Sequence, residues 1–347
     1  MSGGGTEPVL TTKERLGWQN FFAQQISVDD LTHTPPVRVT EVHRNELRVV
    51  GDDIDTGIPP DPAVTVGDWV LFDPVNPKSS RVLERKSLIK RRSPGSDRRE
   101  QLIAANIDTI FIVSSCNQDF NVARLERYVV LAFDAQITPV ILLTKTDLCD
   151  DASEYVTAAQ SISDLVPVVT VDARGDEPKQ KLAQWCGEGQ TIAFLGSSGV
   201  GKSTLTNALA GAEVVATGEI REDDAKGRHT TTRRQLYVVP GGCVVLDTPG
   251  VRELQLTDVA SGIDDVFADL RELTTQCRFR NCQHVSEPGC AVLEGFASGA
   301  VDAERYARWR KLLEEEEFNS TSLAERKTKD KSLHKTIRAS QKHKGRE

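Results

Sequence analysis

Long apolar runs are missing from this sequence. No stretch approaches the roughly 18 to 20 apolar residues that a membrane-spanning helix needs. The first ten residues, Met1 to Leu10, also lack the basic and apolar regions of a secretory signal peptide. These absences argue against a membrane protein and against a secreted one, so we expect a cytoplasmic chain without a membrane partner.

The sequence also lacks the even number of cysteines that a set of disulfides would use. It contains seven, and in a reducing cytosol these are expected to be free thiols or metal ligands. Four of them stand at predicted strand ends or in a helical pattern, where we expect unreactive thiols: Cys116, Cys149, Cys186 and Cys243. The other three fall within one short segment.

Basic residues are concentrated at the end of the chain. The formal net charge is −8, but residues 326–347 hold nine Lys or Arg against Asp330 and Glu347. This segment therefore carries +7 and the rest of the chain −15. A basic arm on an acidic body favours a polyanionic partner, and RNA is the first candidate. A solvated, disordered tail would explain the same charges.

The length of 347 residues predicts two or three domains. Residues 36–95 consist of short β-like runs separated by Gly, Pro, Asn and Asp, which is typical of a small OB-type β-barrel. Its last run, residues 81–92, is rich in Arg and Lys, which suits RNA binding and equally suits a solvated face. Residues 1–35 form an N-terminal extension with a short helix expected over 16–26.

From residue 96 to 260, apolar strand-like runs alternate with helical patterns. This alternation predicts an α/β domain with a mainly parallel sheet and helices on both faces. Two further runs, "RRQLYVV" and "GCVVLDT", are joined by Pro240-Gly241-Gly242 and predict an antiparallel hairpin. Residues 261–325 read as a helical, cysteine-rich domain, which the basic tail at 326–347 follows.

The segment "GSSGVGKST" matches the phosphate-binding pattern G-x-x-x-x-G-K-[ST] between a predicted strand and a predicted helix. Its glycines let backbone N–H groups surround the phosphates. Lys202 can reach the β- and γ-phosphates, and Ser203 can offer its hydroxyl to Mg²⁺. A chance match in a glycine-rich loop is the alternative. The predicted nucleotide-binding loop comprises Gly196, Ser197, Ser198, Gly199, Val200, Gly201, Lys202, Ser203 and Thr204.

Two downstream elements complete the predicted phosphate site. A strand leading into "DTPG" supplies Asp247, which can orient Mg²⁺ and its water, and the Gly250 amide, which can sense the γ-phosphate. Between this element and the loop lies "GRHTTT", where one threonine should close over Mg²⁺ and the γ-phosphate. Thr231 is favoured for this role and Thr230 is the alternative.

The run "LLTKTDL" ends an apolar strand in Thr144-Lys145-x-Asp147. A carboxylate at Asp147 can accept the guanine N1–H and N2–H together, which adenine does not offer, and Lys145 can lay its stem along the base. Joined to the phosphate loop, this motif selects GTP over ATP. Ordinary GTPases have the phosphate loop first and the base reader last, so the reversed order here predicts a circularly permuted GTPase domain.

The segment "CRFRNCQHVSEPGC" supplies Cys277, Cys282, His284 and Cys290. Three thiolates and one imidazole form a closed tetrahedral set that suits a structural Zn²⁺, one per chain, with no open position for catalysis. Free thiols or a disulfide are the alternatives.

In this order, the motifs resemble those of the ribosome small-subunit-dependent GTPase A family, which are circularly permuted GTPases. The likeness covers residues 36–311 and rests on "VGDWV", "TKTDL", "GSSGVGKST", "GRHTTT", "DTPGVRE" and the cysteine set. The resemblance implies an OB-type domain, a permuted P-loop GTPase domain and a helical zinc-binding domain. It also implies ribosome-stimulated hydrolysis of GTP to GDP with Mg²⁺, and late maturation of the 30S subunit through its 16S rRNA. We expect a monomer.

Two positions depart from ordinary GTPases. Thr144 stands where Asn is usual, and the apolar Val251, which cannot orient water, follows the D-x-x-G element. The catalytic group must therefore come from elsewhere. His229 beside the switch threonines is the candidate, which the resemblance also indicates, and an exposed loop histidine is the alternative. Val251 also suits a second hypothesis, a GTP-regulated RNA-binding module with little turnover of its own.

Overall fold

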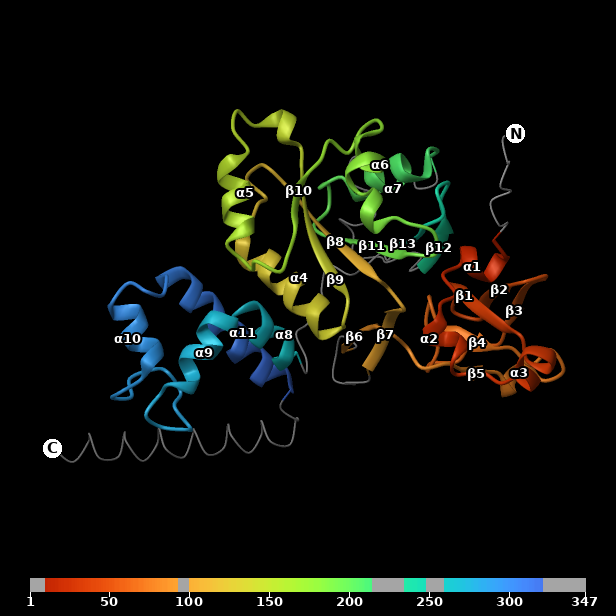
Figure 1. The fold of residues 1–347 in the computed structure, drawn as a ribbon, viewed down its shortest axis with the longest axis horizontal. Helices are drawn as coiled ribbons and strands as arrows, with labels where there is room; N and C mark the ends of the chain where they lie inside the picture. Colours follow the sequence, from red (N-terminus) through yellow and green to blue (C-terminus); the bar gives the residue numbers. More distant parts are fainter. Residues whose placement is uncertain (1–9, 93–99, 214–233, 248–258, 321–347) are drawn as a thin grey trace, which may run out of the picture. The chain divides into compact units, whose positions relative to one another are not determined.

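The computed structural model describes residues 10–92, 100–213, 234–247 and 259–320 (Figure 1). The chain forms two compact units, residues 1–254 and 255–347. Several predicted site residues lie outside the described ranges: His229, Thr230, Thr231, Gly250 and Val251, together with the basic tail at 326–347. Within the described ranges, none of the helices has the length and apolar character needed to cross a membrane.

The N-terminal part of the first unit contains an antiparallel sheet whose strands pair in the order β3, β2, β1, β4, β5. Alternate residues of two neighbouring strands, Val37, Val39, Leu47 and Val49, enter one buried cluster, as the two-residue period of a strand requires. Closure of these strands into an OB-type barrel stays a prediction. Their bounds are β1 (Pro36–Val42), β2 (Leu47–Gly51), β3 (Ile54–Ile58), β4 (Trp69–Leu71) and β5 (Arg81–Val82).

Three short helices precede this sheet, α1 (Thr12–Arg15), α2 (Asn20–Ala23) and α3 (Val28–His33). Leu16 and Phe22 pack against Trp69 in a second buried cluster. The short helix expected over 16–26 covers only Asn20–Ala23, because Gly17 lies at φ +87° and turns the chain before it. A Cβ at that position would also lie 2.7 Å from the carbonyl oxygen of Gly189, so the turn needs glycine.

The α/β part of the unit has the predicted mainly parallel sheet. Strands β8, β9, β10, β11 and β13 pair in parallel, in the order β10, β9, β8, β11, β13. β12 joins the edge as the antiparallel arm of the predicted hairpin with β13. A separate two-stranded ribbon, β6 (Leu88–Arg92) with β7 (Glu100–Ala105), precedes them. The sheet strands are β8 (Thr109–Ser115), β9 (Thr138–Thr144), β10 (Val168–Thr170), β11 (Thr191–Leu195), β12 (Arg234–Val238) and β13 (Val244–Asp247).

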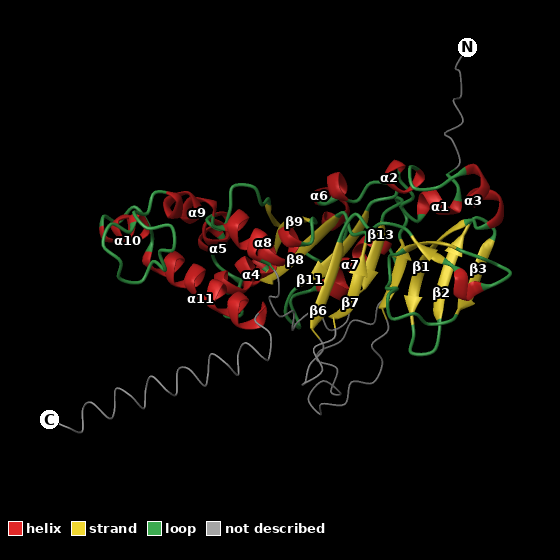
Figure 2. Cartoon of the chain, turned by 90° about the horizontal axis from the view of Figure 1, so that it is seen from below, coloured by secondary structure: helices red, strands yellow, loops and turns green. Residues whose placement is uncertain are grey.

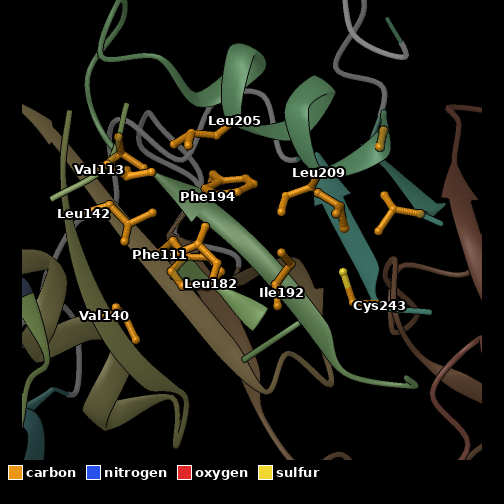
Figure 3. Close-up of a cluster of buried hydrophobic side chains, with 14 of the residues drawn as sticks. Phe111, Val113, Val140, Leu142, Leu182, Ile192, Phe194, Leu205, Leu209 and Cys243 are labelled. Carbon is orange, nitrogen blue, oxygen red and sulfur yellow. The ribbon is translucent and has the colours of Figure 1, made fainter. Parts of the chain in front are cut away.

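Helices cover both faces of this sheet, as predicted. Phe111 and Phe194 point to one face, where they share a buried cluster with Leu205 and Leu209 of α7 (Figure 3). Helix α4 packs against β8 and β9, where the alternate residues Ile110 and Ile112, also buried, face the other way. The helices are α4 (Val122–Asp134), α5 (Ser153–Gln160), α6 (Glu177–Lys181) and α7 (Lys202–Ala210).

The two parts of the first unit share one continuous sheet, because β1 pairs with β12. Figure 2 shows the strands of both parts following one another, with β13 on one side and β1, β2 and β3 on the other. Beside this junction lies Arg38, a fully buried guanidinium. Its Nη1 donates a hydrogen bond to Thr191 Oγ1 at 2.8 Å and its Nη2 to the carbonyl oxygen of Asn106 at 3.1 Å. Thr191 is the first residue of β11, so a residue of the N-terminal sheet holds the base of the strand that leads to the phosphate loop.

The described part of the second unit is helical, as the sequence predicted. It contains α8 (Ala260–Val266), α9 (Ala268–Thr275), α10 (Ala291–Ala297) and α11 (Ala303–Ser320). Helix α9 packs against α10, and α11 packs against α8. The cysteine-rich segment connects α9 to α10.

Candidate functional site

The loop between β11 and α7 has the backbone of a phosphate-binding loop. Gly196 lies at φ +154°, and a Cβ there would lie 2.2 Å from the carbonyl oxygen of Val113, so only glycine lets the loop pass β8 this closely. Gly201, at φ +100°, caps α7. The Lys202 ammonium donates hydrogen bonds to the carbonyl oxygens of Gly196, at 2.9 Å, and Ser197. The Lys202 side chain therefore folds back over the phosphate-binding loop. This same side chain is predicted to contact the phosphates.

The remaining residues of this loop connect the end of β11 to the first turn of α7, as predicted. Ser198 and Gly199 are exposed at its tip, and Val200 is buried against the sheet. Ser203 and Thr204 are half-buried in the first turn of α7. Backbone N–H groups in the first turn of a helix point out of the helix end, which is the arrangement that favours phosphate.

The base-reading loop is tied to the phosphate loop by Thr144. This side chain is fully buried at the end of β9, and its hydroxyl donates a hydrogen bond to the carbonyl oxygen of Val200 at 2.7 Å. Lys145 follows at φ +58° and starts a short turn over Thr146–Leu148, which leaves Asp147 two-fifths exposed. The threonine at this position therefore makes a direct link between the two loops through its hydroxyl.

Replacing Thr144 with Val is expected to remove this link without changing the volume of the side chain. The buried carbonyl oxygen of Val200 would lose its partner, so the free energy of unfolding should fall by about 1–2 kcal/mol and GTP binding should weaken. Denaturant unfolding and nucleotide titration measure both. The matched control is Thr144→Ser, which keeps the hydroxyl. If the Val and Ser variants behave alike, the hydrogen bond does not hold the loops together.

A third loop, residues 171–175, contacts both the base-reading loop and the phosphate loop, and the sequence analysis did not identify it. It follows β10, where the backbone N–H of Val171 donates to the carbonyl oxygen of Leu143 at 2.9 Å. Ala173 lies beside the phosphate loop, since a Cβ built on Gly201 would be 3.6 Å from its Cβ. Arg174 reaches Asp147, with Nη2 2.6 Å from Oδ2. The only signal for this loop in the sequence is that it follows a strand-like run of the predicted mainly parallel sheet, to which the base-reading strand also belongs.

Asp247 is the last residue of β13. This strand runs parallel to β11 with Ala193 opposite Leu246, and parallel strands end at the same edge of a sheet. The backbone of Asp247 therefore lies at the edge from which the phosphate loop departs. This placement agrees with the predicted hairpin arm and supports a role beside the phosphates.

The basic run at 81–92, predicted as an RNA-binding strand or a solvated face, uses part of its charge internally. Arg85 makes two hydrogen bonds to the buried carboxylate of Asp68, at 2.7 and 2.8 Å. Lys86 pairs with Asp108, Nζ to Oδ1, at 2.5 Å. Asp108 also accepts from the backbone N–H of Thr191 at 2.8 Å. These cations thus support the fold at the junction of the first unit.

The predicted zinc ligands of the second unit converge. One ligand atom from each of Cys277, Cys282, His284 and Cys290 can be chosen so that all lie within 4.8 Å of one another. The Sγ atoms of Cys277 and Cys290 are 3.9 Å apart, and His284 Nδ1 lies 3.5 and 3.4 Å from them. Tetrahedral zinc with ordinary bond lengths requires about 3.8 Å between sulfurs and about 3.6 Å from sulfur to nitrogen. The donor set therefore fits zinc.

The segment that carries these ligands is held by its own neighbours. The Glu287 carboxylate accepts backbone hydrogen bonds from Gln283, Val285 and Ser286 at 2.8, 2.9 and 3.0 Å, which lower its pKa to about 2. Tyr306 of α11 donates a hydrogen bond to the carbonyl oxygen of His284. Burial lowers the pKa of the His284 imidazole, which favours the neutral form that binds metal.

The arrangement defines a class of protein. A parallel sheet with a phosphate loop after β11, and a base-reading loop that comes earlier in the chain, is a circularly permuted P-loop GTPase. Two solved structures match this fold. YjeQ from Thermotoga maritima matches with a TM-score of 0.57 and 26% identity, over 81% of this chain and 97% of that one. YloQ, a circularly permuted GTPase, matches with a TM-score of 0.54 and 25% identity, over 84% and 97%.

Sequence comparison gives the family. The family model described as RsgA GTPase matches residues 82–257. Small ribosomal subunit biogenesis GTPase RsgA of Mesorhizobium japonicum is 50% identical over 313 residues, 88% of this chain and 90% of the relative. Small ribosomal subunit biogenesis GTPase RsgA 2 of Vibrio parahaemolyticus is 45% identical over 331 residues, which are 94% of this chain and 91% of the relative. The chain belongs to the RsgA GTPase family.

Proposed function

We propose that this chain binds GTP in the pocket formed by residues 144–147, 171–175 and 196–204, hydrolyses it, and acts in biogenesis of the small ribosomal subunit. The observation that carries the proposal is the convergence of the three loops, joined by the 2.7 Å hydrogen bond from Thr144 to Val200. The names of the relatives, small ribosomal subunit biogenesis GTPases, support the same function for a chain of this family.

Each group in the pocket is assigned one role. Asp147 accepts the guanine N–H groups and Lys145 covers the base. Lys202 and the loop amides bind the phosphates, while Ser203, Asp247 and Thr231 hold Mg²⁺ directly or through water. The Gly250 amide senses the γ-phosphate. Mg²⁺ supplies charge stabilisation of the transferring phosphoryl group when it is bound with GTP.

The parts outside the pocket are assigned to ribosome binding. We place an RNA-binding OB-type domain at 36–95 and a basic RNA-binding tail at 326–347, with the 30S subunit and its 16S rRNA as partners. The zinc ion would cross-link the segment between α9 and α10, since a closed set of four ligands serves structure. In this proposal the protein works as a monomer in the cytoplasm.

The test is GTP hydrolysis with and without purified 30S subunits. Stimulation by the subunit is the expected result. An unchanged rate of phosphate release would instead favour the second hypothesis, a GTP-regulated RNA-binding module with little turnover of its own.

His229→Ala should leave GTP affinity nearly intact and lower the stimulated rate of GTP hydrolysis by about a hundredfold, as loss of a positioned acid or base does. His33→Ala, an exposed histidine on α3, is the matched control. A normal stimulated rate for His229→Ala would make His229 a loop residue only.

A further inference from the structure

We propose that Arg174 is a positioning residue for guanine recognition, because it bridges the base-reading carboxylate of Asp147 to the carboxylate of Asp172. The inference rests on the proposed role of Asp147. Arg174 Nη2 lies 2.6 Å from Asp147 Oδ2, and Arg174 Nε lies 3.2 Å from Asp172 Oδ1. One guanidinium therefore contacts a carboxylate on each of two loops.

The backbone of the third loop sets the position of this arginine. Asp172 Oδ1 accepts the backbone N–H of Arg174 at 3.0 Å, which closes a tight turn. The backbone N–H of Asp172 is held in turn by Glu177 of α6, at 3.2 Å. The side chain of Arg174 consequently leaves a fixed point at the rim of the pocket and extends toward Asp147.

The charges explain why a bridge is needed. Asp147 and Asp172 both lie within hydrogen-bonding distance of one guanidinium, so without Arg174 two carboxylates would lie near each other with no cation between them. Their repulsion would push the two loops apart. Arg174 uses Nη2 on only one oxygen of Asp147, and a carboxylate offers about four acceptor sites in total. Both oxygens of Asp147 thus retain sites for the guanine N1–H and N2–H. The bridge orients the carboxylate and leaves it able to read the base.

The exposure of the pair separates recognition from folding. The side chains of Arg174 and Asp147 are 66% and 40% exposed, and exposed ion pairs contribute little to global stability. Removal of Arg174 should therefore alter nucleotide selection while the chain stays folded. Arg48 and Asp55 form a similarly exposed pair at 2.9 Å between β2 and β3, which provides a matched control away from the three loops.

The experiment measures the affinity of the full chain for GTP, inosine triphosphate and ATP. Inosine triphosphate keeps N1–H but lacks the 2-amino group, so the ratio of GTP to inosine triphosphate affinity reports the second contact to Asp147. For Arg174→Ala we expect GTP affinity to fall about threefold to fivefold, the size of an exposed ion pair, with a lower GTP to inosine triphosphate ratio. Arg48→Ala should bind all three nucleotides with the same affinities as the chain without substitutions.

Two further variants decide the cause. Adding Asp172→Asn to Arg174→Ala removes the facing charge and should recover most of the GTP preference, whereas a role in folding alone would not be rescued. Tighter GTP binding by Arg174→Ala would show that the arginine competes with the base and would overturn the proposal. An unchanged ratio would overturn it as well. Asp147→Ala tests the underlying role: if it keeps its preference for GTP, Asp147 does not read the base, and the inference falls with that assignment.

Discussion

Replacing Lys202 with Ala is expected to lower kcat/KM for GTP by about a hundredfold to a thousandfold, the range seen when one preorganised donor to a developing charge is removed. In the structure, the Lys202 ammonium donates to the carbonyl oxygens of Gly196 and Ser197. We infer that a bound triphosphate would replace these acceptors. Alanine offers neither the charge nor the reach, so both nucleotide binding and turnover should suffer.

The measurement is phosphate release over a range of GTP concentrations, with thermal unfolding to confirm that the variant is folded. Lys179→Ala is the matched control, because Lys179 lies on α6 and pairs with Asp176 at 3.8 Å on the surface of the same unit. Its activity should equal that of the unchanged chain. Turnover by Lys202→Ala within a fewfold of normal would show that the loop does not hold the phosphates in the proposed way.

The second large effect is expected at the metal site. Freshly purified protein should contain one zinc per chain, and Cys282→Ser should lose or loosen it. Structural zinc contributes apparent binding free energies of about 10–16 kcal/mol in small zinc domains, so the segment between α9 and α10 should unfold when one ligand is removed. GTP binding should persist, because the three loops of the pocket belong to the other compact unit.

Elemental analysis gives the zinc content, and limited proteolysis within residues 255–320 reports unfolding of the second unit. Cys186→Ser is the control, since Cys186 is a half-buried cysteine of the first unit and should leave the zinc content unchanged. Zinc-free native protein would refute the assignment of the cluster as a zinc site. A Cys282→Ser variant with full zinc content would remove Cys282 from the ligand set.

Local patterns predicted the elements that depend on near neighbours. The phosphate loop was recognised from Gly196, Gly201 and Lys202 between a strand and a helix. The hairpin of β12 and β13 followed from its Pro-Gly-Gly turn, and the cysteine spacing gave a cluster that the structure brings together. In each case the residues that decide the geometry lie within about a dozen positions of one another.

Features that join distant segments could not be predicted in this way. The pairing of β1 with β12 and the contact between Arg38 and Thr191 link residues more than a hundred positions apart, and neither strand carries a pattern that names its partner. The sequence showed Thr144 in place of the usual Asn but did not show which group its hydroxyl would contact. The acceptor is the backbone carbonyl of Val200, and any residue at position 200 would supply one. Arg174 was not singled out from the sequence, because its partner Asp147 belongs to another loop that only the fold brings beside it.

The permuted order of the loops also determines the order in which the pocket is made during translation. Domains tend to fold from the N-terminus as the chain is synthesised, and β8, β9 and β10 are consecutive strands that pair with one another. The base side of the pocket, with Asp147 and Arg174, can therefore assemble before the phosphate side has left the ribosome. Thr144 is then the point at which the later half of the pocket attaches to a nascent structure that already exists.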